Sequence, residues 1–281
     1  MHGNLVFALV LSGLASLATA FGSLLGMMLQ RPGPRMMAFA LGFSAGVMMF
    51  VSFAELLSTG IHDLGFLPAV GAFFAGMVVM YVIDAVVPHR FISEQTDRAA
   101  PQGEACPDLA AGLGGLRGQH RHRYGWGREQ RAALIRAGIL IAIGIGMHNL
   151  PEGMATFMGA IKSRGLGLAI GSAIALHNIP EGLAVALPIF CATGSRRKAF
   201  GWAFLSGAAE FVGALLAAAV LMPLLTPTFL AVMLASVAGL MVFIAFDELI
   251  PGSYAYGFEH ASVIGIIAGM GLMAVSILVL R

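Results

Sequence analysis

The chain is short of charged residues. Aspartate, glutamate, lysine and arginine make up only 11% of its 281 residues, whereas a soluble domain holds roughly 25%. Hydrophobic residues make up 58% and the mean hydropathy is +0.88. These values exclude an ordinary soluble domain and indicate an integral membrane protein. The net charge of +2 says little about partners, and we expect the lipid bilayer, but no nucleic acid, among them.

Two further absences narrow the class. The only two cysteines, Cys106 and Cys191, have neither CxxC nor zinc-finger spacing, so they indicate neither a thiolate metal site nor a disulfide. The phosphate-binding phrase GxxxxGK[ST] does not occur, so we expect no P-loop ATPase activity.

Apolar runs of membrane-spanning length fill most of the chain. We predict an all-α integral membrane fold of eight transmembrane helices. They cover residues 4–30, 35–58, 65–87, 131–160, 166–192, 199–222, 228–251 and 260–280.

One long polar segment interrupts these runs. Residues 89–127 are rich in glycine and carry scattered charges, which predicts a flexible cytoplasmic loop. This loop divides helices 1 to 3 (residues 1–88) from helices 4 to 8 (residues 128–281). Its histidines, His120 and His122, either capture metal or belong to a solvated basic segment, and the adjacent arginines favour the second interpretation because they repel cations.

Lysine and arginine gather in alternate connections. If the N-terminus lies outside, the cytoplasmic connections hold twelve of these residues and the outer side holds three. The positive-inside rule therefore places both termini in the periplasm or cell exterior.

Two copies of one phrase stand out within the apolar runs. Residues 148–153 read HNLPEG and residues 177–182 read HNIPEG. In a helix, the His and Asn of each copy share a face with the Glu that follows four and three positions later. These side chains and the helix-breaking proline are costly in lipid. Two facing copies would form a site for a polyvalent cation, built from His148, Asn149, Glu152, His177, Asn178 and Glu181.

Acidic residues inside the predicted spans support such a site. An unpaired carboxylate at mid-membrane costs ~2.5 kcal/mol or more, so several together require protonation or a bound cation. Only Arg136 could neutralise them from within a span. Glu152, Glu181 and Glu210 lie deepest. The full set is Glu55, Asp84, Glu152, Glu181, Glu210, Asp247 and Glu248.

A weaker repeat links the second and seventh predicted helices. Residues 50–57 (FVSFAELL) are similar to residues 243–250 (FIAFDELI), although chance similarity between Phe-rich helices is an alternative. The two helices run in opposite directions, as the fourth and fifth do, which predicts inverted-topology repeats arranged 3+2+3. Glu55, Asp247 and Glu248 are candidates for a pathway or gate at the two mouths.

The ligand types narrow the cation. Histidine, asparagine and glutamate offer nitrogen and oxygen donors without thiolate, which suits zinc, iron(II), manganese or cobalt better than copper(I). Two imidazoles disfavour magnesium. The seventeen methionines could suggest a soft-metal path, but pairs such as Met27-Met28 and Met36-Met37 are better interpreted as packing or lipid-facing residues.

With these motifs, the chain closely resembles the ZIP (Zrt/Irt-like) family of divalent metal transporters, and within it the bacterial ZupT-like branch. The resemblance implies a binuclear metal centre that adds Glu210 to the six residues of the two phrases. It also implies an elevator in which helices 1, 4, 5 and 6 carry metal against the other four, and a homodimer. A neutral Asn178, where some branches have an acid, resembles the type with broad specificity.

We therefore expect a bacterial inner-membrane importer that moves zinc, and also iron(II), manganese, cobalt and cadmium, toward the cytoplasm by alternating access. The metal is cargo, and we expect no catalytic cofactor. The alternative is an intramembrane metalloenzyme, such as a lipid hydrolase, in which bound metal activates water.

Overall fold

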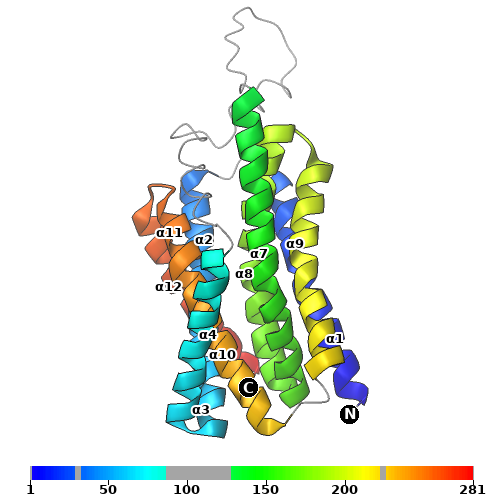
Figure 1. Cartoon of the computed structure of the whole chain (residues 1–281). Coiled ribbons are helices and arrows are strands. Elements are labelled where there is room, and N and C mark those ends of the chain that lie inside the picture. The colour runs from blue at the N-terminus through cyan, green and yellow to red at the C-terminus, as the bar shows by residue number, and fades with distance from the viewer. Residues whose placement is uncertain (1, 29–32, 87–127, 222–225, 281) are drawn as a thin grey trace, which may run out of the picture.

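The computed structural model describes residues 2–28, 33–86, 128–221 and 226–280. Within them every regular element is a helix, which confirms the all-α prediction (Figure 1). The elements are α1 (His2–Met28), α2 (Pro34–Val51), η1 (Ser52–Leu57), α3 (Ser58–Leu64), α4 (Phe66–Val86), α7 (Arg128–Lys162), α8 (Arg164–Thr193), α9 (Arg196–Leu216), η2 (Ala217–Leu221), α10 (Pro227–Ile244), η4 (Ala245–Leu249), α11 (Ile250–Tyr254) and α12 (Glu259–Leu280).

Seven helical segments of the described chain are long and apolar enough to cross a membrane. They correspond to all the predicted spans except the fourth, which falls in the 35-residue helix α7. The count of eight and the inverted repeat therefore stay predictions. The predicted loop at 89–127 lies outside the described residues.

A side-chain cap and a glycine fix the two ends of α8, the helix that carries the second HNxPEG phrase. Ser163 begins α8 by accepting a hydrogen bond from the backbone N–H of Leu166 at 3.1 Å. Gly194 ends the same helix with φ of 64°, a left-handed conformation that a side chain disfavours. Because α7 and α8 are joined directly at Lys162–Arg164, they form an antiparallel hairpin (Figure 1).

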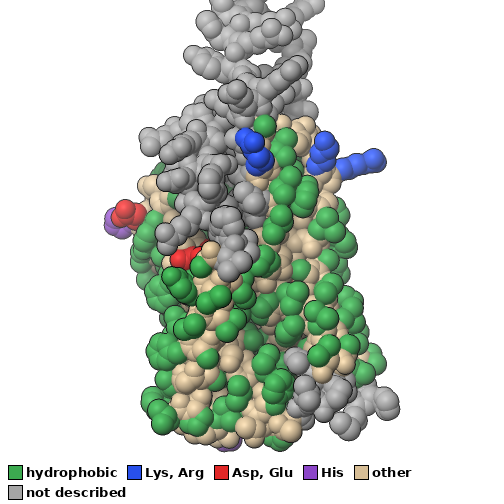
Figure 2. All heavy atoms as spheres, viewed as in Figure 1, with side chains coloured by type: hydrophobic (Ala, Val, Ile, Leu, Met, Phe, Trp, Pro, Cys, Tyr) green, Lys and Arg blue, Asp and Glu red, His purple; other side chains and the backbone are tan. Residues whose placement is uncertain are grey.

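The termini lie at one end of the bundle, and the basic side chains visible on one face lie at the other. Both termini are at the lower end in Figure 1, and the Lys and Arg side chains visible in Figure 2 gather at the upper end. Which end faces the cytoplasm stays a prediction from the positive-inside rule.

Glycine lets the helices pack closely within two groups. We call α1, α7, α8 and α9 the motif group, because it holds both HNxPEG phrases, and α2, α3, α4, α10, α11 and α12, with η1 and η4, the flanking group. A Cβ atom on Gly182 of α8 would lie 1.9 Å from the carbonyl oxygen of Thr19 in α1. In the flanking group, a Cβ atom on Gly239 of α10 would lie 1.8 Å from that of Phe73 in α4. Among the described glycines, every approach of this kind closer than 3 Å joins helices of the same group.

Side chains, by contrast, connect one group to the other. The Ser44 hydroxyl donates to the carbonyl of His177 at 3.3 Å, and an ion pair joins Lys162 to Asp63. The backbones are thus closest within each group, while polar side-chain contacts bridge the two.

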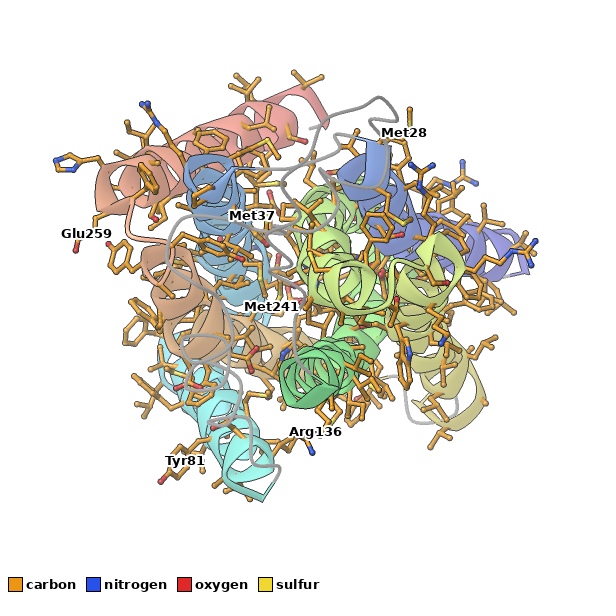
Figure 3. The ribbon with its side chains drawn as sticks, turned by 90° about the horizontal axis from the view of Figure 1, so that it is seen from above. Met28, Met37, Tyr81, Arg136, Met241 and Glu259 are labelled. Carbon is orange, nitrogen blue, oxygen red and sulfur yellow. The ribbon has the colours of Figure 1, made fainter. Side chains whose placement is uncertain are left out.

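Two residues differ from what their positions in the sequence suggested. Arg136 is exposed on the outside of α7, as the view along the bundle shows (Figure 3), so it does not neutralise the buried acids. Sequence position gives the depth of a residue but not the helix face on which it lies. Cys191 is disulfide-bonded. Spacing along the chain does not report distance in space, so the cysteine spacing did not indicate this bond.

In each of the methionine pairs Met27-Met28 and Met36-Met37, one side chain packs inside the bundle and the other lies at its surface. Met27 and Met37 are buried, at 6% and 2% exposure, whereas their neighbours Met28 and Met36 are 77% and 37% exposed. Figure 3 shows Met37 inside the bundle and Met28 at its periphery.

Candidate metal centre

The seven predicted ligands all lie in the interior of the motif group. None is more than 3% exposed, although the set includes three carboxylates and two imidazoles. Helix α7 contributes the first HNxPEG phrase, α8 the second and α9 the remaining acid. The residues are His148, Asn149, Glu152, His177, Asn178, Glu181 and Glu210.

The imidazole of His177 is oriented as a ligand. Its Nδ1 lies 3.1 Å from the carbonyl oxygen of Ala173, which can only accept, so Nδ1 carries the proton. Its Nε2 lies 3.1 Å from an oxygen of Glu152. Two ligand atoms bound to one tetrahedral ion at about 2.0 Å lie roughly 3.3 Å apart. The pair is therefore spaced to share one cation, and the Ala173 carbonyl fixes the ring as outer-shell partners of metal-binding histidines do.

Backbone carbonyls fix the two amides as well. The Asn149 side chain donates to the carbonyl of Ser206 at 3.1 Å. The Asn178 side chain donates to the carbonyl of Ala15 at 3.2 Å and to Glu210 at 2.7 Å. Because each carbonyl accepts only, the NH₂ group of each amide must face it, and each amide oxygen is left for another partner.

Five buried oxygens of this cluster have no hydrogen-bond partner among the described residues. Each is an acceptor, and a buried acceptor without a partner costs about 1–3 kcal/mol. Bound cations are partners that such acceptors take, so the chemistry of the donor set fits metal ions. The atoms are Asn149 Oδ1, Glu152 Oε1, Asn178 Oδ1, Glu181 Oε2 and Glu210 Oε1.

Glu248 links this cluster to the flanking group. Its carboxylate lies 2.9 Å from Nε2 of His148, and its side chain is 27% exposed. Sequence reasoning placed Glu248 at a mouth but missed this direct contact, because the two residues lie 100 positions apart. A ligand atom of Glu248 also lies within 4.8 Å of one from Asp247 and one from Asp84.

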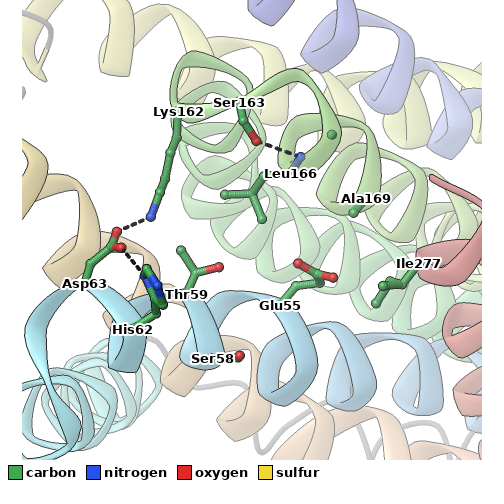
Figure 4. Close-up of a pocket in the computed structure, with 11 residues that line it drawn as sticks. Glu55, Ser58, Thr59, His62, Asp63, Lys162, Ser163, Leu166, Ala169 and Ile277 are labelled. Atoms are coloured by element: carbon green, nitrogen blue, oxygen red, sulfur yellow. Dashed lines mark hydrogen bonds and ion pairs between the residues drawn. The ribbon is translucent and has the colours of Figure 1, made fainter. Parts of the chain in front are cut away.

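Glu55 lies apart from the cluster, in the flanking group. It is 7% exposed and lines a cavity of about 550 Å³ beside the α7–α8 turn (Figure 4). The structure thus separates the pathway candidates: Glu248 touches the centre from one end of the bundle, and Glu55 lies toward the other.

Known proteins are similar in sequence to this chain over nearly its whole length. Residues 7–277 match the family described as ZIP Zinc transporter. The chain is 42% identical over 283 residues to the zinc transporter ZupT of Corynebacterium efficiens. The matched region covers 98% of this chain and 97% of that protein. It is 44% identical over 280 residues to the zinc transporter ZupT of Akkermansia muciniphila, covering 97% of both. With nearly its full length matched by the family and by these two relatives, the chain belongs to the ZIP zinc transporter family.

Proposed function

We propose that the protein imports divalent metal cations, zinc foremost, across the bacterial inner membrane. The observation that carries this proposal is the set of five buried, partnerless acceptor oxygens beside two imidazoles, inside a bundle of membrane-crossing helices. The similar proteins are named as zinc transporters, which favours transport over the metalloenzyme alternative.

The same donors support a site that accepts several metals. Oxygen and imidazole ligands without thiolate suit zinc, iron(II), manganese, cobalt and cadmium. Seven ligand residues exceed the four that one tetrahedral zinc ion uses. We therefore propose a binuclear centre in which the two HNxPEG phrases and Glu210 hold the cargo.

Packing of the two groups supports alternating access. Two helices move past each other at lower free-energy cost where only their side chains meet than where their backbones are in close contact. The glycine contacts bring backbones together only within each group. We propose that the motif group moves as a unit against the flanking group and carries the metal with it, in a protein that assembles as a homodimer.

Metal uptake into proteoliposomes tests the function. Vesicles that contain the purified protein should accumulate radioactive zinc faster than empty vesicles. A metalloenzyme would turn over a lipid substrate without accumulating metal. Uptake equal to that of empty vesicles, with zinc, iron(II) and manganese each tested, would refute the transport proposal.

The topology gives a separate prediction. Single cysteines introduced by Ser93→Cys and by Ser163→Cys, in a background without native cysteines, should be labelled from opposite sides of the membrane. We expect an impermeant maleimide to label intact cells at position 163 but not at position 93. Labelling of both positions in sealed cells would contradict the eight-span topology.

Asn178→Asp should change metal preference. The substitution removes both amide donations and adds a negative charge beside Glu210, in a poorly solvated place where charges interact strongly. We expect tighter binding, slower release and an altered ranking of zinc, iron(II), manganese and cadmium in competition uptake. Asn4→Asp, at an exposed position of α1, is the matched control. An unchanged ranking and affinity would show that Asn178 does not contact the metal.

A further inference from the structure

Glu55 and Glu248 occupy corresponding places in the two halves of the flanking group. Each lies in a π-helical segment, η1 or η4, and these segments coincide with the similar phrases at residues 50–57 and 243–250. A π turn holds an extra residue, which rotates the following side chains by about 100°. Such segments are frequent at functional sites. The same local distortion of the helix thus orients the side chains of both acids.

The motif group shows a matching correspondence between its own halves. Asn149 of α7 donates to Ser206 of α9 at 3.1 Å, and Asn178 of α8 donates to Ala15 of α1 at 3.2 Å. The helix crossings correspond as well. A Cβ atom on Gly153 would meet the carbonyl oxygen of Glu210, while one on Gly182 would meet that of Thr19. Ser206 of α9 lies 191 positions after Ala15 of α1, and Glu210 lies 191 positions after Thr19. The two helices therefore correspond with one constant offset. His148 in α7 therefore corresponds to His177 in α8.

The two histidines nevertheless have different partners. His148 contacts Glu248, across the boundary between the groups, at 2.9 Å. His177 instead contacts Glu152, within its own group, at 3.1 Å. The structure is thus asymmetric at the pair of contacts that the correspondence makes equivalent.

We propose that Glu55 and Glu248 exchange: when the motif group moves toward the cavity, Glu248 releases His148 and Glu55 engages His177. Each acid then passes cargo between the centre and its own end of the bundle. The inference rests on the proposed transport function, and it assigns the two acids a specific, alternating partner.

One face of α8 connects His177 with the cavity that holds Glu55. Ala169 lines the cavity that holds Glu55, and Ala169, Ala173 and His177 share one face of α8 because they are four residues apart. The carbonyl of His177 accepts from Ser44, which precedes Glu55 by three turns, or roughly 16 Å. The two side chains span part of this distance, so we expect a slide of one to two turns, about 5–10 Å, to bring them together.

An ion pair stabilises the described state, before the slide. Lys162, at the α7–α8 turn, contacts Asp63 of α3 at the rim of the cavity (Figure 4). A slide of α8 along α2 must carry Lys162 away from Asp63. In the described state, therefore, the contacts at both ends, Lys162 with Asp63 and His148 with Glu248, oppose the slide.

Cross-linking of the purified full-length protein tests the exchange without any measurement of transport. In a background without native cysteines, a short bis-methanethiosulfonate should link the pair Glu55→Cys/His177→Cys and also the pair Glu248→Cys/His148→Cys. The pair Phe53→Cys/His177→Cys is the control, since Phe53 lies in the same π segment but is 47% exposed on its outer face. Failure of the first pair to link while the second pair links overturns the proposal, as does equal linking of the control.

A second measurement keeps the ligand histidines intact. Ala169 is 4% exposed here, and the slide would expose it, so Ala169→Cys reports the moved state through its rate of maleimide labelling. We expect Glu248→Gln to raise this rate and Glu55→Gln to lower it, each at least threefold. Changes in the same direction, or no change, overturn the exchange. Because neither readout depends on uptake, a failure of the transport proposal would be recognised separately in proteoliposomes.

Discussion

Glu152→Gln should lower metal uptake by about 100-fold while the protein stays folded. Glu152 is fully buried, one of its oxygens lies 3.1 Å from Nε2 of His177, and its other oxygen has no hydrogen-bond partner among the described residues. Glutamine keeps the shape but removes the negative charge. Removing one partner of a buried charge pair at a binding site costs about 2–5 kcal/mol of binding free energy, and each 1.4 kcal/mol is roughly tenfold in affinity.

The matched control is Glu259→Gln. Glu259 lies in the first turn of α12 and is exposed at the periphery (Figure 3), so its charge is screened and its loss should change uptake by less than twofold. Uptake of radioactive zinc, manganese and iron by both variants, normalised to protein in the membrane, makes the comparison. Wild-type uptake by Glu152→Gln would remove Glu152 from the centre.

The sequence predicted the helices well because membrane spans are written in local composition. An apolar run of about 20 residues must form its hydrogen bonds internally, and a helix does so. Hydropathy along the sequence did not show that the second and seventh segments continue through η1 and η4 to Leu64 and Tyr254. A π turn is a change of hydrogen-bond register, which neither hydropathy nor helical periodicity reports.

The candidate site was predictable only in part, for a related reason. Spacing within one helix places His177 and Glu181 on one face, and the cost of burying polar groups marks both as functional. Which helices face each other depends on packing between distant segments. The donation from Asn178 to Ala15, across 163 positions, and the contact between His148 and Glu248 are of this kind. Sequence position likewise suggested that Arg136 could contact the buried acids, whereas its side chain is exposed.

Close packing of α7 on α9 leads to a second large expected effect. A Cβ atom on Gly153 would lie 1.7 Å from the carbonyl oxygen of Glu210 and 3.1 Å from the backbone nitrogen of Ala214. Backbone atoms cannot rotate away as a flexible side chain can, so Gly153→Ala must push the two helices apart. Overpacking of this kind typically costs about 1–3 kcal/mol.

Function should suffer more than stability. Glu210 accepts from Asn178 at 2.7 Å, and a shift of α9 moves this carboxylate relative to the ligands of α7 and α8. We expect Gly153→Ala to lower zinc uptake at least tenfold and to lower the temperature of thermal unfolding. In a helix interior, alanine is otherwise favoured over glycine by about 0.8–1.0 kcal/mol, so a net loss of stability reports the crossing itself.

Gly201→Ala separates the two contributions. Gly201 lies in α9, and a Cβ atom there would meet nothing within 4 Å. This variant should keep wild-type uptake and unfold at an equal or slightly higher temperature, because it gains helix propensity without a clash. If Gly153→Ala behaves like Gly201→Ala in both measurements, α7 and α9 do not cross closely at Gly153, and Glu210 is not held beside the two HNxPEG phrases by this contact.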